Sequence, residues 1–263
     1  MSTSIGEDGV CEGVLYMSLY LTYEEMLKIC EKINEKFIPN GESFLEKVDE
    51  LFDIDEPVTF QNFMVTTLKE LLKVVDEEIN KIEEYVNIKP SCYKGCAYCC
   101  YFPIIVTKAE AKLMVEYIHS LPKQKQQQIW NHINQYFESY SDKISEACSL
   151  NFQDDRFFKE TYIRKQLPCP FLDTKTNTCL VYEVRPIPCR TYLNYCHPSV
   201  CAENDVPKEP FSYEFVYAFY MQALNEVIQE LTEEEEFDFD YPNDLITYDY
   251  LPNLLSEYKP TDS

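Results

Sequence analysis

The sequence predicts a mostly α-helical fold with little β structure, in which an irregular cysteine-rich stretch forms a metal-binding core. Three observations lead to this prediction. Several long segments place apolar residues at intervals of three and four, the period of an amphipathic helix. The stretch 167–210 is instead rich in Pro and Cys and has no long apolar period. Hydrophobic residues make up 45% of the 263 residues, so the helices can bury a core.

The first two helices are predicted near the N-terminus. Thr22 and Glu25 have the spacing of a capping box, in which each side chain binds the other residue's backbone N–H. The helix that follows carries an apolar stripe and is expected to end at the Pro-Asn-Gly turn of residues 39–41. A second helix is expected over residues 44–52.

The longest periodic segment covers residues 66–86, where Glu and Lys separate the apolar positions. This pattern predicts an amphipathic helix whose apolar face packs in the core. Thr107 and Glu110 form the capping box of the next helix. Three more helices are expected, at residues 123–139, 155–166 and 211–231.

We divide the chain into three regions. Residues 1–89 form an N-terminal helical region, and residues 90–201 form a cysteine-cluster metal-binding domain. Residues 202–263 form a C-terminal helix and an acidic tail that packs on the same body. Within the mostly exposed tail, three apolar residues are expected to dock: Tyr248, Leu251 and Leu254.

The first cysteine cluster has four cysteines within nine residues: Cys92, Cys96, Cys99 and Cys100. Thiolates at this spacing are soft ligands that suit zinc or an iron–sulfur cluster. The first three can point toward one site. Cys100 is adjacent to Cys99 and is therefore expected to bind a second metal or another iron of one cluster.

The second cluster contributes Cys169, Cys179 and Cys189. Arg185 and Arg190 lie beside these cysteines, and their positive charge would offset that of several thiolates. Arg190 could instead bind a carboxylate or phosphate of a substrate.

Downstream, Cys196, His197 and Cys201 could complete a second site with mixed sulfur and nitrogen ligands, as in many zinc sites. In the alternative interpretation, His197 is a surface residue of a turn before Pro198. We include Cys196 with the seven cysteines above as a candidate metal ligand.

The two clusters together resemble the YkgJ-like CxxCxxCC family of zinc- or iron-chelating domains. Its hallmark is an early cluster that ends in a Cys-Cys pair, followed by a block written C-P-F-L…C…Y…R-P…C-R. Residues 169–190 match this block residue for residue. The first cluster departs slightly, because three residues rather than two separate Cys92 from Cys96. The resemblance covers about residues 90–201, and it implies metal binding, with Tyr182, Arg185 and Arg190 as candidate cofactor-binding residues.

The resemblance leaves the activity open. The cysteine block is distantly similar to that of flagellin lysine methylase, which implies an iron–sulfur cluster and methyl transfer from S-adenosylmethionine to a protein. An acidic surface would then attract a basic protein or peptide. An iron–sulfur oxidoreductase is a further alternative, and no catalytic residue can be named.

A third alternative is a radical S-adenosylmethionine enzyme, in which three cysteines hold a [4Fe–4S] cluster. The C-x3-C-x2-C spacing, with Tyr98 before the third cysteine, fits that class. Those enzymes are built on repeated strand–helix units, which this sequence does not indicate.

Charge and composition restrict the partners and the compartment. The chain has 46 acidic and 23 basic residues, a net charge of −23, which disfavours binding to nucleic acid. No apolar run reaches the roughly 18 residues that span a membrane, and the N-terminus lacks the pattern of a signal peptide. We therefore expect a cytoplasmic protein, whose clustered cysteines are ligands rather than disulfides. Seven thiolates exceed one tetrahedral site, which favours a cluster or two metals. We expect an iron–sulfur cluster, with zinc as the alternative.

Overall fold

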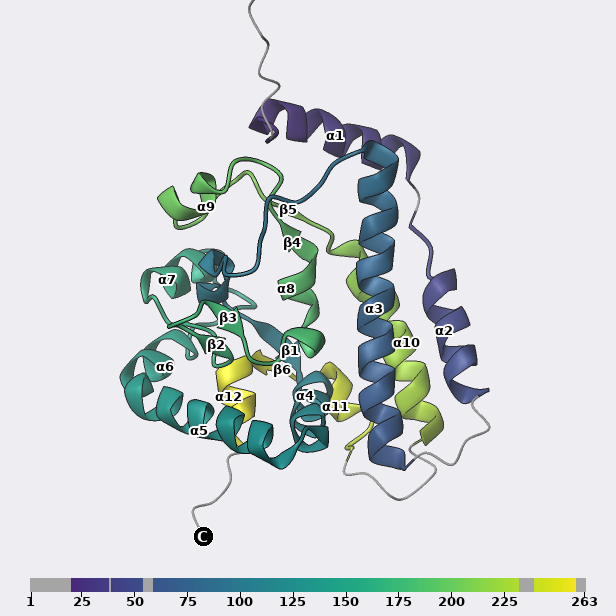
Figure 1. Cartoon of the computed structure of the whole chain (residues 1–263), viewed down its shortest axis with the longest axis vertical. Helices are drawn as coiled ribbons and strands as arrows, with labels where there is room; N and C mark the ends of the chain where they lie inside the picture. Colours follow the sequence, from purple (N-terminus) through teal and green to yellow (C-terminus); the bar gives the residue numbers. More distant parts are fainter. Residues whose placement is uncertain (1–19, 38, 54–58, 232–238, 259–263) are drawn as a thin grey trace, which may run out of the picture.

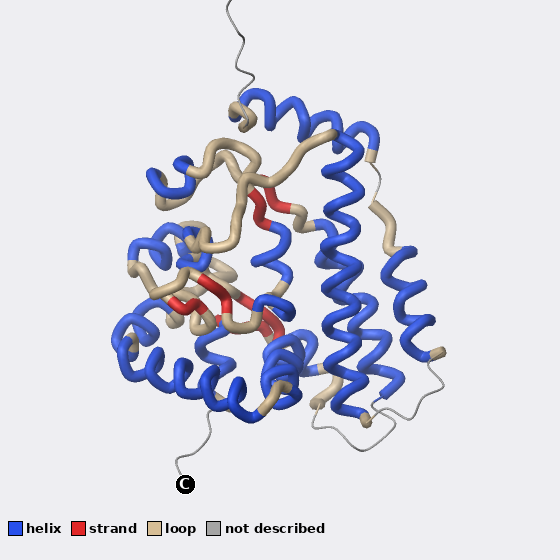
Figure 2. The backbone as a smooth tube through the Cα atoms, viewed as in Figure 1, coloured by secondary structure: helices blue, strands red, loops and turns tan. Residues whose placement is uncertain are grey.

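The computed structural model describes residues 20–37, 39–53, 59–231 and 239–258 (Figure 1). Helices dominate these residues, and the named strands occur only as short antiparallel pairs (Figure 2). The prediction of a mostly helical fold is confirmed. Among the described residues, no helix is both long and apolar enough to cross a membrane.

The longest helix, α3 (Phe60–Val86), lies at the centre of one side of the molecule (Figure 1). It begins earlier than the predicted residue 66, because the Thr59 side chain accepts the backbone N–H of Asn62 and caps the helix there. Leu71 and Val75 are fully buried on its inner face. The helices that pack against α3 include α1 (Tyr23–Lys36), α2 (Glu42–Phe52), α4 (Lys108–Ser120) and α10 (Phe215–Leu231).

Both predicted capping boxes are present. Thr22 accepts the backbone N–H of Glu25 at 3.2 Å at the start of α1. Thr107 accepts that of Glu110 at 3.1 Å at the start of α4, and the Glu110 carboxylate binds back to the Thr107 N–H. These caps satisfy N–H groups that a helix start leaves unpaired, which explains why the helices begin where the sequence predicts.

A second group of helices lies on the other side of the molecule (Figure 1). Its members are α5 (Lys123–Ser139), α6 (Ser141–Ala147) and α7 (Phe158–Arg164). Tyr136, Tyr162 and Tyr250 form the centre of a small hydrophobic cluster there. The rings of Tyr162 and Tyr250 are stacked with their centroids 5.5 Å apart.

The C-terminal segment packs against an element from the first half of the chain. It consists of α11 (Asn243–Ile246), β6 (Tyr248–Tyr250) and α12 (Leu251–Ser256). Strand β6 pairs antiparallel with β1 (Ile105–Thr107), so that Val106 lies opposite Asp249. Leu251 and Leu254 are buried as expected, whereas Tyr248 stays 39% exposed.

The cysteine-rich stretches form short elements. They are η1 (Tyr98–Tyr101), β2 (Leu172–Asp173), β3 (Thr178–Cys179), η2 (Tyr182–Val184), α8 (Ile187–Thr191), β4 (Tyr192–Leu193), α9 (Ser199–Glu203) and β5 (Phe211–Ser212). Helix α8 packs against α3, and α9 packs against η1. Strands β2 and β3 pair with each other, as do β4 and β5. The main hydrophobic core joins buried residues of all three sequence regions, among them Met64, Val184 and Leu255.

Candidate metal centre

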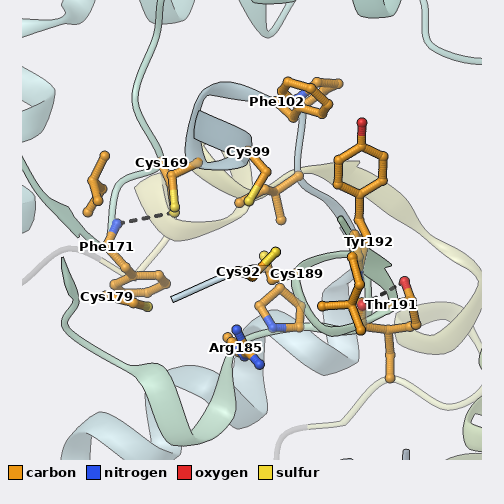
Figure 3. A pocket seen from close by; sticks show the side chains of 18 of the residues that line it. Cys92, Cys99, Phe102, Cys169, Phe171, Cys179, Arg185, Cys189, Thr191 and Tyr192 are labelled. Carbon is orange, nitrogen blue, oxygen red and sulfur yellow. Dashed lines mark hydrogen bonds between the residues drawn. The ribbon is translucent and has the colours of Figure 1, made fainter. Parts of the chain in front are cut away.

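One cavity collects the predicted ligands from both cysteine clusters. Its volume is about 1400 Å³, and Figure 3 shows cysteines of both clusters at its wall. The cysteines that line it are Cys92, Cys96, Cys99, Cys100, Cys169, Cys179 and Cys189. The structure therefore brings together seven of the eight cysteines that the sequence nominated.

Backbone hydrogen bonds hold the two clusters side by side. The N–H of Cys169 donates to the carbonyl of Cys100 at 2.7 Å. At the other end of the first cluster, the N–H of Ser91 donates to the carbonyl of Asn194 at 2.7 Å, and the Asn194 amide donates to the Ser91 hydroxyl at 2.9 Å. Asn194 is buried. Sequence reasoning missed this residue, because no local pattern marks a contact across 103 positions.

The first cluster is shaped by a tight turn and a short helix. The Cys96 N–H donates to the Tyr93 carbonyl at 2.9 Å, and Gly95 within this turn has a φ of 97°. Glycine tolerates this left-handed conformation, which other residues rarely adopt. The chain then enters η1, which carries Cys99 and Cys100 as neighbours. Three residues separate Cys92 from Cys96, one more than in the family motif, and this turn accommodates the additional residue.

The second cluster is built on a hairpin and the short helix α8. Cys179 lies on β3 opposite Leu172 of β2, and the N–H of Phe171 donates to the Cys169 sulfur at 3.5 Å (Figure 3). Such N–H donors stabilise a thiolate. Cys189 lies in α8, where its N–H donates to the carbonyl of Pro186 at 2.9 Å.

The cysteines interact electrostatically across the two clusters. Burial raises the pKa of the Cys169 thiol well above its usual value, and the charges of Cys179 and Cys189 add to that effect. Burial also raises the pKa of Cys189, with further contributions from Cys99 and Cys179. A side-chain hydrogen bond with Cys100 instead lowers the pKa of Cys99 to about 7. Several buried thiolates in one place would repel each other, and a bound cation would remove that cost.

The donor set fits a thiophilic metal in kind and in number, since all seven donors are cysteine sulfurs. As placed, no three His, Cys, Asp or Glu side chains of the described residues are arranged closely enough to hold a metal ion. Binding would therefore have to draw the sulfurs together, and six of these seven cysteines lie on loops or on short elements of two or four residues.

The two arginines beside the second cluster have different surroundings. Arg190 is 6% exposed, forms an ion pair with Asp76 of α3, and donates to the carbonyls of Glu183 and Arg185. These bonds fix α8 to α3 and leave Arg190 little capacity for a substrate. Arg185 lines the cavity, and its guanidinium lies 4.4 Å from the ring centroid of Tyr182.

The downstream residues separate in the structure. Cys196 is buried outside the cavity, where its N–H donates to the Asn194 side chain and it forms a β-bridge with Leu21. His197 is exposed and lies edge-on to Tyr20, with the ring centroids 4.9 Å apart. We therefore leave both residues out of the ligand set proposed below.

Cys201 belongs with the first cluster rather than with Cys196. It lies in α9, which packs against η1. Burial raises its pKa to about 12, with contributions from the charges of Cys92, Cys96 and Cys99. It does not line the cavity. The spacing of Cys201 from His197 did not predict its place beside the first cluster. Helix α9 brings Cys201 close to a segment some hundred residues earlier in the chain.

Comparison with known proteins agrees with the geometry. Residues 91–209 match the CxxCxxCC family. Its model is described as "Putative zinc- or iron-chelating domain". The matched CxxCxxCC domain is less than half of the chain, and it contains both cysteine clusters and α9. Helices α1 to α3 precede it, and α10 to α12 follow it. No curated protein and no solved structure gave a significant match.

Proposed function

We propose that the CxxCxxCC domain holds an iron–sulfur cluster through the thiolates of the seven cysteines that line the cavity. The observation that carries this proposal is their position at one cavity, although the two clusters lie far apart in the sequence. One tetrahedral zinc ion takes four thiolates. Seven cysteine sulfurs exceed that number and favour a cluster with several metal atoms.

An iron–sulfur cluster would give the protein an electron-transfer or a structural role. The surrounding residues suit either role. The Phe171 N–H donates to one sulfur. The positive charges of Arg185 and Arg190 lower the pKa of Cys179 against the larger effect of burial, and would thereby offset the charge of several thiolates.

Anaerobic purification followed by elemental analysis tests the proposal. We expect a brown protein with broad violet absorbance and stoichiometric iron and sulfide. Cys179→Ser should lose at least half of the iron, because it removes one ligand. Cys148→Ser is the matched control, since Cys148 is buried outside the cavity and should leave the iron content unchanged. A colourless protein with stoichiometric zinc would overturn the assignment to iron, and a metal-free protein would overturn the metal centre itself.

No contact or comparison favours either S-adenosylmethionine enzyme over this proposal. The methylase alternative and the basic protein or peptide partner stay predictions from the sequence. The radical enzyme alternative expects repeated strand–helix units, whereas the described residues contain only strand pairs of two or three residues per strand. Titration of the metal-loaded protein with S-adenosylmethionine tests these alternatives, and the absence of binding would count against both.

A further inference from the structure

The cavity is larger than the metal centre requires. Its volume is about 1400 Å³. A water molecule takes about 30 Å³ of liquid volume, and pockets that enclose drug-sized molecules measure about 300–1,000 Å³. A few metal ions, or one small cluster, would fill only a small part of this volume as it stands before the sulfurs are drawn together.

Between and beside the cysteines, the walls are largely apolar and aromatic. They include Ile104, Ile163, Phe171 and Leu193, and Phe102 faces Tyr192 with ring centroids 5.4 Å apart (Figure 3). Tyr93 and Tyr182 also line the cavity, and each is 59% exposed. Exposed tyrosines around an apolar cavity offer flat surfaces on which a ring can stack.

The charged residues of the cavity differ from those of the chain as a whole. Basic residues are outnumbered two to one overall, with 23 against 46 acidic residues. The cavity is lined by three basic side chains, Lys94, Lys159 and Arg185, against two acidic ones, Glu183 and Glu214. Glu183 already forms an ion pair with Lys69 at 3.1 Å. When the cysteines are left out of the count, the cavity therefore has more positive than negative side chains.

Arg185 is the basic residue best placed to bind an anionic group. Its Nε is buried and has no hydrogen-bond partner among the described residues. Within the same part of the chain, the Arg185 guanidinium forms no ion pair. The guanidinium has five N–H donors in a planar fork, so it can face the thiolates and still bind a second acceptor. The fork matches a carboxylate or sulfonate through two parallel hydrogen bonds.

We propose that the cavity binds a small aromatic molecule with one acidic group, which Arg185 holds while the ring lies against the aromatic walls beside the metal centre. The location of this second site rests on the proposed function, but its binding chemistry depends on the protein side chains alone. Arg185 is a binding residue in this proposal, in addition to offsetting the charge of the thiolates.

A pair of fluorescent probes tests the proposal on the full-length, metal-loaded protein. 1-Anilinonaphthalene-8-sulfonate carries an aromatic body and one acidic group, and N-phenyl-1-naphthylamine has the same body without the charge. We expect saturable binding of one equivalent of the sulfonate. Arg185→Met should weaken the sulfonate about 10-fold or more, as expected for loss of a charged hydrogen-bonded pair, and should change the affinity for the amine less than about two-fold.

Arg164→Met is the matched control, because its side chain is 73% exposed on α7 and does not line the cavity. It should bind both probes as the wild type does. Equal sulfonate affinity in Arg185→Met and wild type would overturn the proposal, and so would the absence of saturable sulfonate binding. Metal content and circular dichroism are measured on each variant.

If Arg185→Met loses the metal, Arg185→Lys replaces it, because this variant keeps the charge and loses the fork. We expect a several-fold weaker affinity for the sulfonate with metal retained, and wild-type affinity would overturn the role of the guanidinium. Failure of the metal centre is recognised separately, by elemental analysis of the same wild-type sample.

Discussion

The Glu110 side chain combines a cap with a buried charge. One carboxylate oxygen accepts the Thr107 N–H at 2.9 Å and the Thr107 hydroxyl at 3.0 Å. Its other oxygen is buried and has no hydrogen-bond partner among the described residues. Burial raises the pKa of Glu110 from 4.5 to about 7. The residue therefore stabilises the start of α4 and lowers the stability of the core when it ionises.

The first prediction concerns Glu110→Gln, which keeps the cap and removes the charge. Below pH 4.5 the carboxyl is protonated in both the folded and the unfolded chain, so it makes no pH-dependent contribution. Between pH 4.5 and 7 the unfolded chain ionises first, so the free energy of unfolding of the wild type falls as pH rises, by at most about 3 kcal/mol for this one group.

We therefore expect Glu110→Gln to gain stability relative to the wild type as pH rises from about 4.5 to 7. Urea unfolding of both proteins at pH 4.5 and pH 8, with the same metal content, measures this difference. Glu84→Gln, an exposed position on α3, should show no such change. A stability difference between Glu110→Gln and wild type that is independent of pH would contradict the prediction.

Single residues also mark the limit of what the sequence reveals. The seven cavity cysteines could be nominated from their spacing, because cysteines at these intervals are typical of metal ligands. The residues that bind Arg190 but not Arg185 could not be predicted from the sequence. Arg190 pairs with Asp76, which lies 114 positions away and is one of many acidic residues on a periodic helix.

Among the elements, α3 has the largest share of the core. Leu71 is fully buried between the helices that pack on it, whereas Lys73, two residues along, has a side chain that is 61% exposed. We expect Leu71→Ala to lower the free energy of unfolding by about 2–5 kcal/mol, because it removes buried methyl groups and leaves a cavity. Lys73→Ala should change it by less than about 0.5 kcal/mol. Denaturant unfolding compares the two, and an equal effect would refute the central position of α3.

The long helices were predictable because their apolar residues recur over several turns. Helix α5 spans Lys123–Ser139 as expected, and α10 begins at Phe215 rather than at residue 211, where strand β5 lies instead. Short elements such as α6, α8 and α9 have five to seven residues. Two turns or fewer give no period to recognise, and tertiary contacts decide their conformation.

At the scale of the whole molecule, bound metal should link the two cysteine clusters and stabilise the segment that carries the second one. Residues 167–209 have few long elements of their own, so bound metal would supply much of their stability. We expect a chelator to increase amide hydrogen exchange in this segment by 10-fold or more, while α3 and α10 keep their protection. Hydrogen exchange with mass spectrometry measures both. Unchanged protection in residues 167–209 after complete removal of the metal would show that packing alone holds the segment.

The hydrogen bond from Cys169 to Cys100 also constrains how the protein matures. Translation adds Cys100, the last cysteine of the first cluster, 69 residues before Cys169. During that interval the nascent chain cannot complete the site, and its early thiols are available to oxidants and to stray metal ions. Strand β6, which pairs with β1, is synthesised later still. Loading of a metal that needs both clusters therefore has to follow the synthesis of Cys189.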